Sequence, residues 1–440
     1  MTTIPKSFLL GAATAAYQIE GAVTEDGRGP SIWDVFSHEN GRTQGGDNGD
    51  IACDHYHLYP EDIRIMKQIG LDAYRFSIAW PRLFPNGSGG LNEAGLDFYR
   101  RLVEGLREAG IKPVATLYHW DLPQALMHQG GWTNRETAYR FAEYAHTVFT
   151  RLGDDIPMYI TLNEPWCSAV LGHLLGEHAP GLHDLGATIA ASHHLLLGHG
   201  LALEAFRGEH LKDARIGMTN VLTHNIPASG SEADLQAVDK ADAVFNRWFL
   251  DPLFRGSYPQ LQQAFGIASA VKSGDLELIS QPVDFLGVNY YNTNIVSANP
   301  ADPLLGVTLE QPGTARTEMD WGIAPEGLHK VLSRLHQDYT KVPIYITENG
   351  AAFADEVVNG TVSDKHRMDY IHAHLEQVLR AREEGVDVRG YFVWSLLDNF
   401  EWAFGYSKRF GLVYVDYATQ QRIWKQSAKW YQEVIHKRQL

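Results

Sequence analysis

Two glutamates in this sequence occupy the same kind of local setting. Residues 342–350 begin as an alternating run of β-branched and aromatic residues, which is typical of a short buried strand. The run ends in Glu348, followed by the turn dipeptide Asn-Gly. Residues 157–165 repeat the design, with an apolar run that leads into Asn163, Glu164 and a proline. Either glutamate alone is typical of a solvated loop. Together they predict two carboxylates that face one site, because barrel enzymes keep catalytic groups at the carboxyl ends of their strands.

A pair of carboxylates suits the cleavage of a glycosidic bond. Glycoside hydrolysis needs one carboxyl group protonated, to give a proton to the leaving oxygen, and the other ionised, as nucleophile or base. The surroundings must therefore separate the two pKa values. We expect Arg75 and the phenol of Tyr291 to keep Glu348 ionised, by charge and by hydrogen bonding. The negative charge on Glu348 would then raise the pKa of Glu164 and keep it an acid near neutral pH.

The elements that must position these residues alternate between strand and helix. Strand-like runs lie at residues 7–16, 73–80, 112–120, 157–164, 215–220, 283–291, 342–350 and 388–395. Helical patterns lie at residues 60–69, 92–109, 134–152, 189–206, 232–249, 325–337, 364–384 and 427–436. Eight alternating units predict a parallel α/β sheet, and this number favours a closed (β/α)8 TIM barrel with extended βα loops. No linker, repeat or low-complexity segment divides the chain, so we predict one catalytic barrel domain over residues 1–440.

The residues at the carboxyl ends of the predicted strands form a candidate binding site. They are Gln18, Arg75, His119, Trp120, Asn163, Glu164, Asn220, Asn289, Tyr291, Glu348 and Trp394. Singly, several have structural explanations: Arg75 as an ion-pair residue, Trp394 as core, His119 as a satisfied polar residue. As a set they combine two acids with amides and aromatic rings. This combination suits a sugar, whose ring offers an apolar face and a circle of hydroxyls, and no glycine-rich phosphate loop accompanies it.

The composition excludes several classes of partner. The chain has 440 residues, with 37 Lys+Arg against 53 Asp+Glu and a formal net charge of −16. This balance disfavours a nucleic-acid partner and an anionic membrane surface. No apolar run approaches the ~20 residues that span a bilayer. We predict neither a cofactor nor a metal site, since the histidine-rich stretch at residues 54–57 lacks the spacing of zinc ligands. The oligomeric state is open, and a homo-oligomer is one option.

The cysteines and the first residues bear on location. Cys53 and Cys167 are the only two cysteines, too few for a disulfide scaffold. Free buried thiols in a reducing compartment fit them better, so we predict a cytoplasmic protein. Residues 8–16, preceded by Lys6, loosely imitate a signal peptide with an Ala-x-Ala site. We interpret them as the first strand and its loop, because the apolar run is short and the basic region holds one lysine.

Several motifs together resemble one known family. Residues 161–165 (Thr-Leu-Asn-Glu-Pro) and 346–350 (Ile-Thr-Glu-Asn-Gly) resemble the acid/base and nucleophile motifs of family 1 glycoside hydrolases, the β-glucosidase family. Similar segments lie at residues 8–21, 74–80, 117–123 and 394–402, so the resemblance covers nearly the whole chain. It implies a retaining double displacement with Glu348 as nucleophile and Glu164 as acid/base. A mechanism that retains the anomeric configuration in turn implies that the two carboxyl groups lie ~5–5.5 Å apart.

The resemblance also implies how the sugar is held. Gln18, His119, Asn163, Glu401 and Trp402 would hydrogen-bond the hydroxyls of the terminal sugar, and Trp394 would form the platform beneath it. Asn163 would reach the 2-hydroxyl, where contacts strengthen in the transition state. The implied activity is hydrolysis of terminal non-reducing β-D-glucosyl residues from cello-oligosaccharides and aryl β-glucosides. Side activity on β-galactosides or β-fucosides and transfer to alcohols would use the same mechanism.

Two alternatives stay open from the sequence. A 6-phospho-β-glycosidase would carry a phosphate grip near the last strand, where this chain has Glu401 and Trp402; Lys408 and Arg409 lie close by. A non-catalytic sugar-binding barrel is the second alternative. The presence of both glutamates argues against it. The preference for the group beyond the cleaved bond would come from loops such as residues 297–321, whose shape the sequence does not predict.

Overall fold

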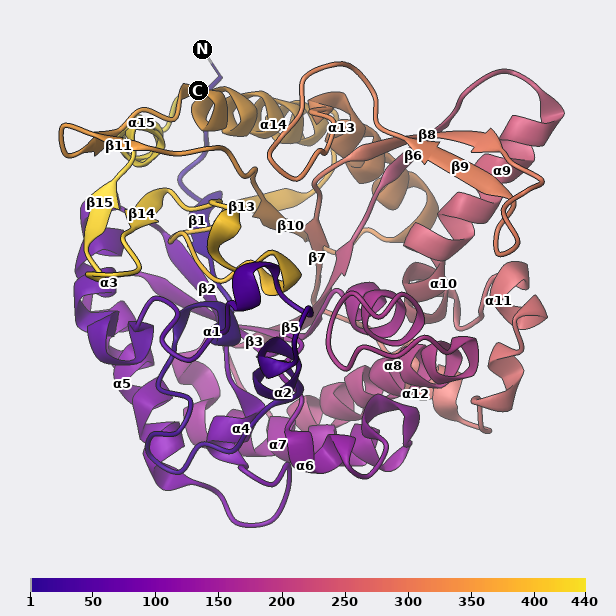
Figure 1. The fold of residues 1–440 in the computed structure, drawn as a ribbon, viewed down its shortest axis with the longest axis horizontal. Coiled ribbons are helices and arrows are strands. Elements are labelled where there is room, and N and C mark those ends of the chain that lie inside the picture. The colour runs from indigo at the N-terminus through magenta and orange to yellow at the C-terminus, as the bar shows by residue number, and fades with distance from the viewer. Residues whose placement is uncertain (1) are drawn as a thin grey trace.

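Eight parallel strands close into a barrel in the structure, a computed structural model in which residues 2–440 are described (Figure 1). The strands neighbour one another in the order β1-β13-β10-β7-β5-β4-β3-β2. Their bounds are β1 Leu9–Ala13, β2 Ala73–Ser77, β3 Lys112–Tyr118, β4 Met158–Asn163, β5 Arg215–Val221, β7 Phe285–Asn289, β10 Ile344–Asn349 and β13 Val388–Trp394. The predicted (β/α)8 barrel is therefore confirmed. The strands are buried along almost their whole lengths, which explains their near-continuous apolar runs.

The helices between the strands lie outside the barrel (Figure 1). They are α3 His55–Ile69, α5 Glu93–Glu108, α7 Glu136–Leu152, α8 Leu185–Gly208, α9 Glu232–Asp242, α10 Trp248–Arg255, α13 Pro325–Arg334, α14 Lys365–Glu383 and α15 Gln426–Lys437. Helix α5 shows why they form: its buried residues Leu96, Val103 and Leu106 recur at helical spacing, and its other face is charged. Each such apolar stripe packs against the outer face of the strands.

Additional elements extend the loops between strands and helices. Short helices are α1 Ala16–Ile19, α2 Ile32–His38, α4 Trp80–Leu83, α6 Gln124–Met127, α11 Gln260–Ala264 and α12 Asp275–Ile279. A three-stranded sheet joins β6 His224–Pro227, β8 Thr293–Ala298 and β9 Val307–Glu310. Two hairpins pair β11 Val357–Val358 with β12 Thr361–Val362, and β14 Val413–Val415 with β15 Arg422–Trp424. The extended βα loops that the sequence predicts are thus present.

Three predicted helices differ from those observed. Helix α3 begins at His55 and contains Pro60, whereas the sequence predicted a start at Pro60. Proline is typical of the first turn of a helix, and here one further turn precedes it. The helices predicted over residues 232–249 and 325–337 contain π-helical turns at residues 243–247 and 335–339, which periodicity alone does not reveal. A third π-helical segment, Cys167–Leu174, follows β4.

The two ends of the described chain pair with each other. Thr2 and Leu440 exchange backbone hydrogen bonds of 3.1 and 3.0 Å, and Thr3 forms an antiparallel bridge with Gln439. Arg438 donates to the carbonyl of Phe8, directly before β1. This join therefore lies at the amino-terminal end of the barrel, and Figure 1 shows the two termini side by side. Among residues 2–440, none of the helices combines the length and the apolar character that crossing a membrane requires.

Candidate active site

Glu348 lies near the end of β10 with both carboxylate oxygens bound. Its Oε1 accepts a hydrogen bond of 2.5 Å from Nη1 of Arg75, and its Oε2 accepts one of 2.6 Å from the hydroxyl of Tyr291. The side chain is 4% exposed, so this carboxylate is largely dehydrated. A guanidinium and a phenol therefore replace the solvent around Glu348 and orient its free lone pairs.

Arg75 joins four strands of the barrel through one guanidinium. From β2 it donates through Nε to Thr116 on β3 at 3.0 Å and through Nη2 to Oδ1 of Asn163 on β4 at 2.6 Å. Its Nη1 reaches β10, at Glu348 and at the carbonyl of Thr347. Arg75 therefore has both a structural and a functional part: its guanidinium joins the strands, and it also contacts Glu348.

Glu164 follows β4 and is held by two different donors. Its Oε1 accepts from Nδ2 of Asn289 at 2.6 Å, and its Oε2 accepts from the thiol of Cys167 at 3.1 Å. Its backbone φ of +43° lies in the left-handed region, which a non-glycine residue rarely adopts. Trp120 and Trp402 in the same site also have positive φ values. Such conformations persist only where the surrounding structure enforces them, and they concentrate at functional sites.

The two carboxyl groups differ in what surrounds them. Burial and the charge of Glu348 together raise the pKa of Glu164 to about 8, against the hydrogen bonds from Asn289 and Cys167 and the charge of Arg75. Burial also raises the pKa of Glu348, while Arg75 and Tyr291 lower it without fully offsetting the burial. Arg75 and Tyr291 therefore favour the ionised form of Glu348, and burial opposes them. Because only Glu348 contacts a cation, it is the first of the pair to ionise.

His119 presents a free donor to the cavity. Oδ1 of Asn163 accepts from Arg75 and from Asn289, at 2.6 and 3.1 Å, which fixes the orientation of the Asn163 amide. Its Nδ2 consequently donates to Nε2 of His119 at 3.0 Å. Burial and the charge of Arg75 hold the pKa of His119 well below its usual value, so the ring is neutral. The proton of His119 therefore sits on Nδ1, which is buried and has no partner in the protein.

Gln18 offers the opposite group. Its Nε2 donates to Oδ1 of Asn399 at 3.0 Å, to the carbonyl of Phe400 at 2.9 Å and to Oε2 of Glu401 at 3.3 Å. Its Oε1 is buried without a partner and is therefore a free acceptor. Burial, with the charge of Glu348, raises the pKa of Glu401 to about 8. His119 and Glu401 thus bring a free donor and a third carboxyl group to one cavity, and the free acceptor of Gln18 lies directly behind Glu401; recognition of several hydroxyls requires groups of both kinds.

A cavity of about 450 Å³ opens above these groups. Of the residues predicted from the sequence, those that line it are His119, Trp120, Glu164, Tyr291, Glu348, Trp394, Glu401 and Trp402. Its walls are aromatic: the rings of Trp120 and Trp402 lie 4.6 Å apart between centroids, and His119 stacks on Trp394 at 5.8 Å. A pocket of this size, mostly apolar with few placed polar groups, is typical of a small-molecule site.

Five other predicted residues lie behind the lining. Arg75, Asn163, Asn289 and Gln18 contact lining residues through the hydrogen bonds given above. Asn220 on β5 is 3% exposed, and its Nδ2 is buried without a partner among the described residues. A part for Asn220 in binding stays a prediction.

The sequence reasoning missed several residues of this site. Cys167 contacts Glu164 directly, and its position three residues later on a helical segment was the available signal. Trp166 and Phe245 line the cavity and were not predicted, and Trp321 lines it from the loop 297–321, which was predicted to contribute although its shape was not. Trp321 belongs to the long loop after β9, and Phe245 to a π-helical turn, so neither position follows from periodicity.

A closed parallel barrel that holds two differently supported carboxyl groups above free polar atoms and aromatic walls has the features of a glycoside hydrolase. A sequence model of glycosyl hydrolase family 1 matches residues 1–440. β-Glucosidase A of Acetivibrio thermocellus is 49% identical over 443 residues, which cover 98% of each chain. The bifunctional β-D-glucosidase/β-D-fucosidase of Bifidobacterium breve is 50% identical over 463 residues, 99% of each chain. The β-glucosidase of Thermotoga maritima, solved in complex with glucoimidazole, is 48% identical, with a TM-score of 0.96 over 100% of both chains. The chain belongs to glycosyl hydrolase family 1.

Proposed function

We propose that this chain is a retaining β-glucosidase that removes terminal β-D-glucosyl residues, with Glu348 as nucleophile and Glu164 as acid/base. One observation carries the assignment of roles. Glu348 is bound by a guanidinium and a phenol, whereas Glu164 is bound by an amide and a thiol and has a pKa raised to about 8. At neutral pH one carboxyl group is thus available as an anion and the other as an acid.

The first step forms a bond to the enzyme. An oxygen of Glu348 attacks the anomeric carbon, the bond from that carbon to the leaving oxygen breaks, and Glu164 gives its proton to that oxygen. The product leaves as an alcohol, and the sugar remains as an ester of Glu348. Arg75 and Tyr291 hold the attacking carboxylate in place, so little reorganisation is needed as the bond forms.

The second step uses the same two residues in new roles: Glu164 acts as the base, and Glu348 is the leaving group. Once Glu348 is esterified, its negative charge is gone, and one cause of the raised pKa of Glu164 disappears. Glu164, now ionised, accepts a proton from water as the water oxygen attacks the anomeric carbon and Glu348 leaves as a carboxylate. An alcohol in place of water would give transglycosylation, which we propose as a side reaction.

The free polar atoms support recognition of the terminal sugar. Nδ1–H of His119 can donate to a hydroxyl oxygen, and Oε1 of Gln18 and the carboxyl group of Glu401 can accept from hydroxyls. Nδ2 of Asn163 keeps a second N–H, which we assign to the 2-hydroxyl. Trp394 supplies the platform. Because the Gln18–Glu401 pair can accept from a 4-hydroxyl of either orientation, we also propose weaker activity on β-galactosides and β-fucosides, and a relative is named for both glucosidase and fucosidase.

The charges around the cavity disfavour a phosphorylated sugar. The acids that line it are Glu164, Glu177, Glu348 and Glu401, whereas no lysine or arginine lines it in the described chain. Lys408 donates to the carbonyl of Glu318, and Arg409 pairs with Asp398 at 2.7 Å. Both basic residues near the last strand are therefore engaged elsewhere, and a sugar phosphate would meet only like charge.

The deciding experiment removes the nucleophile and replaces it chemically. Purified wild-type protein should hydrolyse p-nitrophenyl β-D-glucopyranoside, and Glu348→Ala should lose activity by a factor on the order of 10⁵. Added azide should restore turnover of the variant and yield the α-glucosyl azide, because azide enters the space that the carboxylate vacates. Glu177→Ala is the matched control, since Glu177 is an acid of the same cavity that lies at its exposed side.

Other outcomes would contradict the proposal in distinct ways. Hydrolysis of the 6-phosphoglucoside but not of the glucoside would overturn the assignment of Glu401 and Trp402. Binding of glucose without turnover of either substrate would leave a binding protein. A cytoplasmic location and a homo-oligomeric state stay predictions, which fractionation of cells and light scattering would test.

A further inference from the structure

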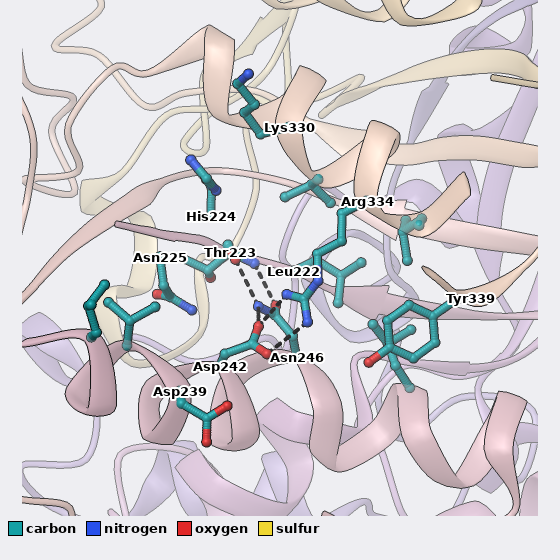
Figure 2. A pocket seen from close by; sticks show the side chains of 15 residues that line it. Leu222, Thr223, His224, Asn225, Asp239, Asp242, Asn246, Lys330, Arg334 and Tyr339 are labelled. Atoms are coloured by element: carbon teal, nitrogen blue, oxygen red, sulfur yellow. Dashed lines mark hydrogen bonds and ion pairs between the residues drawn. The ribbon is translucent and has the colours of Figure 1, made fainter. Parts of the chain in front are cut away.

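A second cavity lies on the outer side of the barrel wall, away from the carboxylate pair. It measures about 320 Å³ and opens between the segment that follows β5, helix α9 and helix α13 (Figure 2). Two of the π-helical turns border it, through Asn246 on residues 243–247 and through Tyr339 on residues 335–339. Such turns are rare and occur frequently at functional sites.

The cavity contains an unpartnered buried donor. Oδ1 of Asn225 accepts from Nδ2 of Asn294 at 3.1 Å, which fixes the orientation of the Asn225 amide. Its Nδ2 is buried and finds no hydrogen-bond acceptor among residues 2–440. Figure 2 shows Asn225 on the side of the cavity opposite Tyr339. Buried polar groups are nearly always paired, so this N–H calls for an acceptor that enters the cavity from outside.

The charged residues that line the cavity are two acids, Asp239 and Asp242, and two bases, Lys330 and Arg334, so the charges of the lining cancel. Asp242 binds Arg334 through both oxygens, at 2.5 and 2.8 Å, and Arg247, outside the lining, pairs with Asp239 at 2.7 Å and with Asp242 at 2.9 Å. Burial and the charges of Lys330 and Arg334 lower the pKa of His224, which is therefore neutral at pH 7. A balanced lining of this kind gives no net attraction for an anion or a cation.

The rest of the lining is apolar. Leu222, Leu250 and Leu335 form part of it, beside the polar groups already named. An apolar surface with few hydrogen-bonding groups and no net charge suits a molecule that has an apolar face and several hydroxyls. The volume lies near the lower end of the 300–1,000 Å³ typical of small-molecule sites, which fits one sugar ring better than a chain of them.

The second cavity shares a wall with the catalytic one. Thr223 lines both. On the π-helical turn, Phe245 faces the catalytic cavity and its neighbour Asn246 faces the second. Asn246 accepts from the backbone N–H of Thr223 and donates to its carbonyl, both at 2.9 Å, and donates to Asp242 at 2.7 Å. A continuous set of hydrogen bonds thus runs from the Arg334–Asp242 pair to the wall of the catalytic cavity.

We propose that this cavity is a second binding site, separate from the catalytic one, for a small neutral polyhydroxylated molecule of the size of a monosaccharide. A hydroxyl oxygen accepts from Nδ2 of Asn225, and hydroxyls donate to the outward carboxylate of Asp239. The apolar face of the ring lies against the leucines. The proposal does not depend on which carboxylate is the nucleophile, because none of the catalytic residues borders this cavity.

The test is calorimetry with D-glucose after the catalytic cavity has been occupied. The protein is first labelled with 2,4-dinitrophenyl 2-deoxy-2-fluoro-β-D-glucoside, and mass spectrometry reports whether the label forms. This readout tests the catalytic proposal by itself. Labelled wild-type protein should still bind glucose, and a crystal soaked in glucose should show the sugar beside Asn225. Val238→Phe, which fills the cavity from α9, should weaken this binding by at least ~10-fold.

The controls separate this site from others. Val358→Phe makes the same change on the exposed hairpin β11–β12 and should bind glucose as wild type does. Asn225→Ala removes the unpaired donor without filling space and serves where Val238→Phe does not fold. Equal glucose binding in all variants, or a soaked crystal with only water in the cavity, would overturn the proposal. So would binding of inorganic phosphate in preference to glucose, since the argument from balanced charge would then be wrong.

Discussion

Two clusters of buried charge in this protein differ in their balance. The catalytic cluster places three carboxyl groups, Glu164, Glu348 and Glu401, around one guanidinium, that of Arg75. The other cluster joins the hairpin β14–β15 to helices α14 and α15. In it Lys425 contacts Asp355 and Asp398, at 2.5 and 2.6 Å. Further ion pairs join Arg367 to Asp355 and Asp364, and Arg409 to Asp398.

The difference shows in the pKa values. In the balanced cluster, the charges of Lys425 and Arg367 outweigh burial and lower the pKa of Asp355. In the catalytic cluster, burial and like charge raise the pKa of Glu164 and of Glu401 to about 8. Burial alone therefore does not mark a functional acid. A shortage of cations around buried acids does, because the protein then keeps a proton that it can transfer.

The largest effect is expected from Glu164→Gln, which removes the acid but keeps the shape. Hydrolysis of cellobiose, whose leaving group needs a proton, should fall by about 10²–10⁴-fold. Hydrolysis of 2,4-dinitrophenyl glucoside should fall far less in its first step, because that leaving group departs without protonation. Steady-state and burst kinetics on both substrates check this. Equal losses on both would show that Glu164 positions the substrate and does not supply the proton.

In the balanced cluster, Lys425→Met should act on stability and leave catalysis in place. Removing Lys425 leaves three buried acids, Asp355, Asp364 and Asp398, with only the two cations Arg367 and Arg409, and this excess of negative charge should cost about 3–5 kcal/mol of unfolding free energy. Denaturant unfolding measures the loss, and kcat at low temperature should stay near the wild-type value. Lys429→Met, at an exposed position of helix α15, which Lys425 directly precedes, is the control and should change stability little. An unchanged stability of Lys425→Met would remove the basis of the comparison.

The catalytic cluster should respond in the opposite direction when a charge is removed. The folded-state pKa of Glu401 lies at about 8, above its ordinary value of 4.5, so its ionisation opposes folding. The stability that its protonated form provides is complete below pH 4.5 and is lost as pH rises through about 8. Glu401→Gln should therefore raise the unfolding free energy above pH 8 by roughly 1–3 kcal/mol while lowering activity. Thermal unfolding at acid and alkaline pH checks this, and a stabilisation confined to acid pH would contradict it.

The smallest effect concerns the thiol beside Glu164. Activity should decline as pH rises through about 8, because Glu164 then loses the proton that it must give. The hydrogen bond from Cys167 lowers this pKa, so Cys167→Val should move the alkaline limb of kcat/KM upward by roughly 0.5 unit. Cys167→Ser, which keeps a donor, should leave the limb near its wild-type position. An identical limb in all three proteins would show that the thiol only fills space.

Much of this arrangement follows from the order of the residues. Strand and helix patterns predicted the barrel, and a barrel brings the ends of β4 and β10 to one face, so Glu164 and Glu348 could be paired from the sequence. The resemblance added Glu401 and Trp402, which lie on an irregular segment after β13. Eight of the predicted residues line the observed cavity.

The remainder depends on contacts between distant residues. The tautomer of His119 follows from the amide of Asn163, whose orientation depends in turn on Arg75 and Asn289. None of these links has a signature in the sequence. The π-helical turns were not predicted either. One extra residue only shifts the phase of the apolar pattern, and in a short helix such a shift looks like ordinary irregularity, yet one of these turns separates the two cavities.

The pairing of Thr2 with Leu440 has a practical consequence. Both ends emerge at the amino-terminal end of the barrel, whereas the catalytic cavity opens at the carboxyl ends of the strands. A tether attached at Thr2 or at Leu440 would hold the molecule by the side opposite the opening of the catalytic cavity. Immobilised on a bead or a fibre in this way, every copy would present its cavity to the surrounding liquid, and the choice of end would make no difference to access.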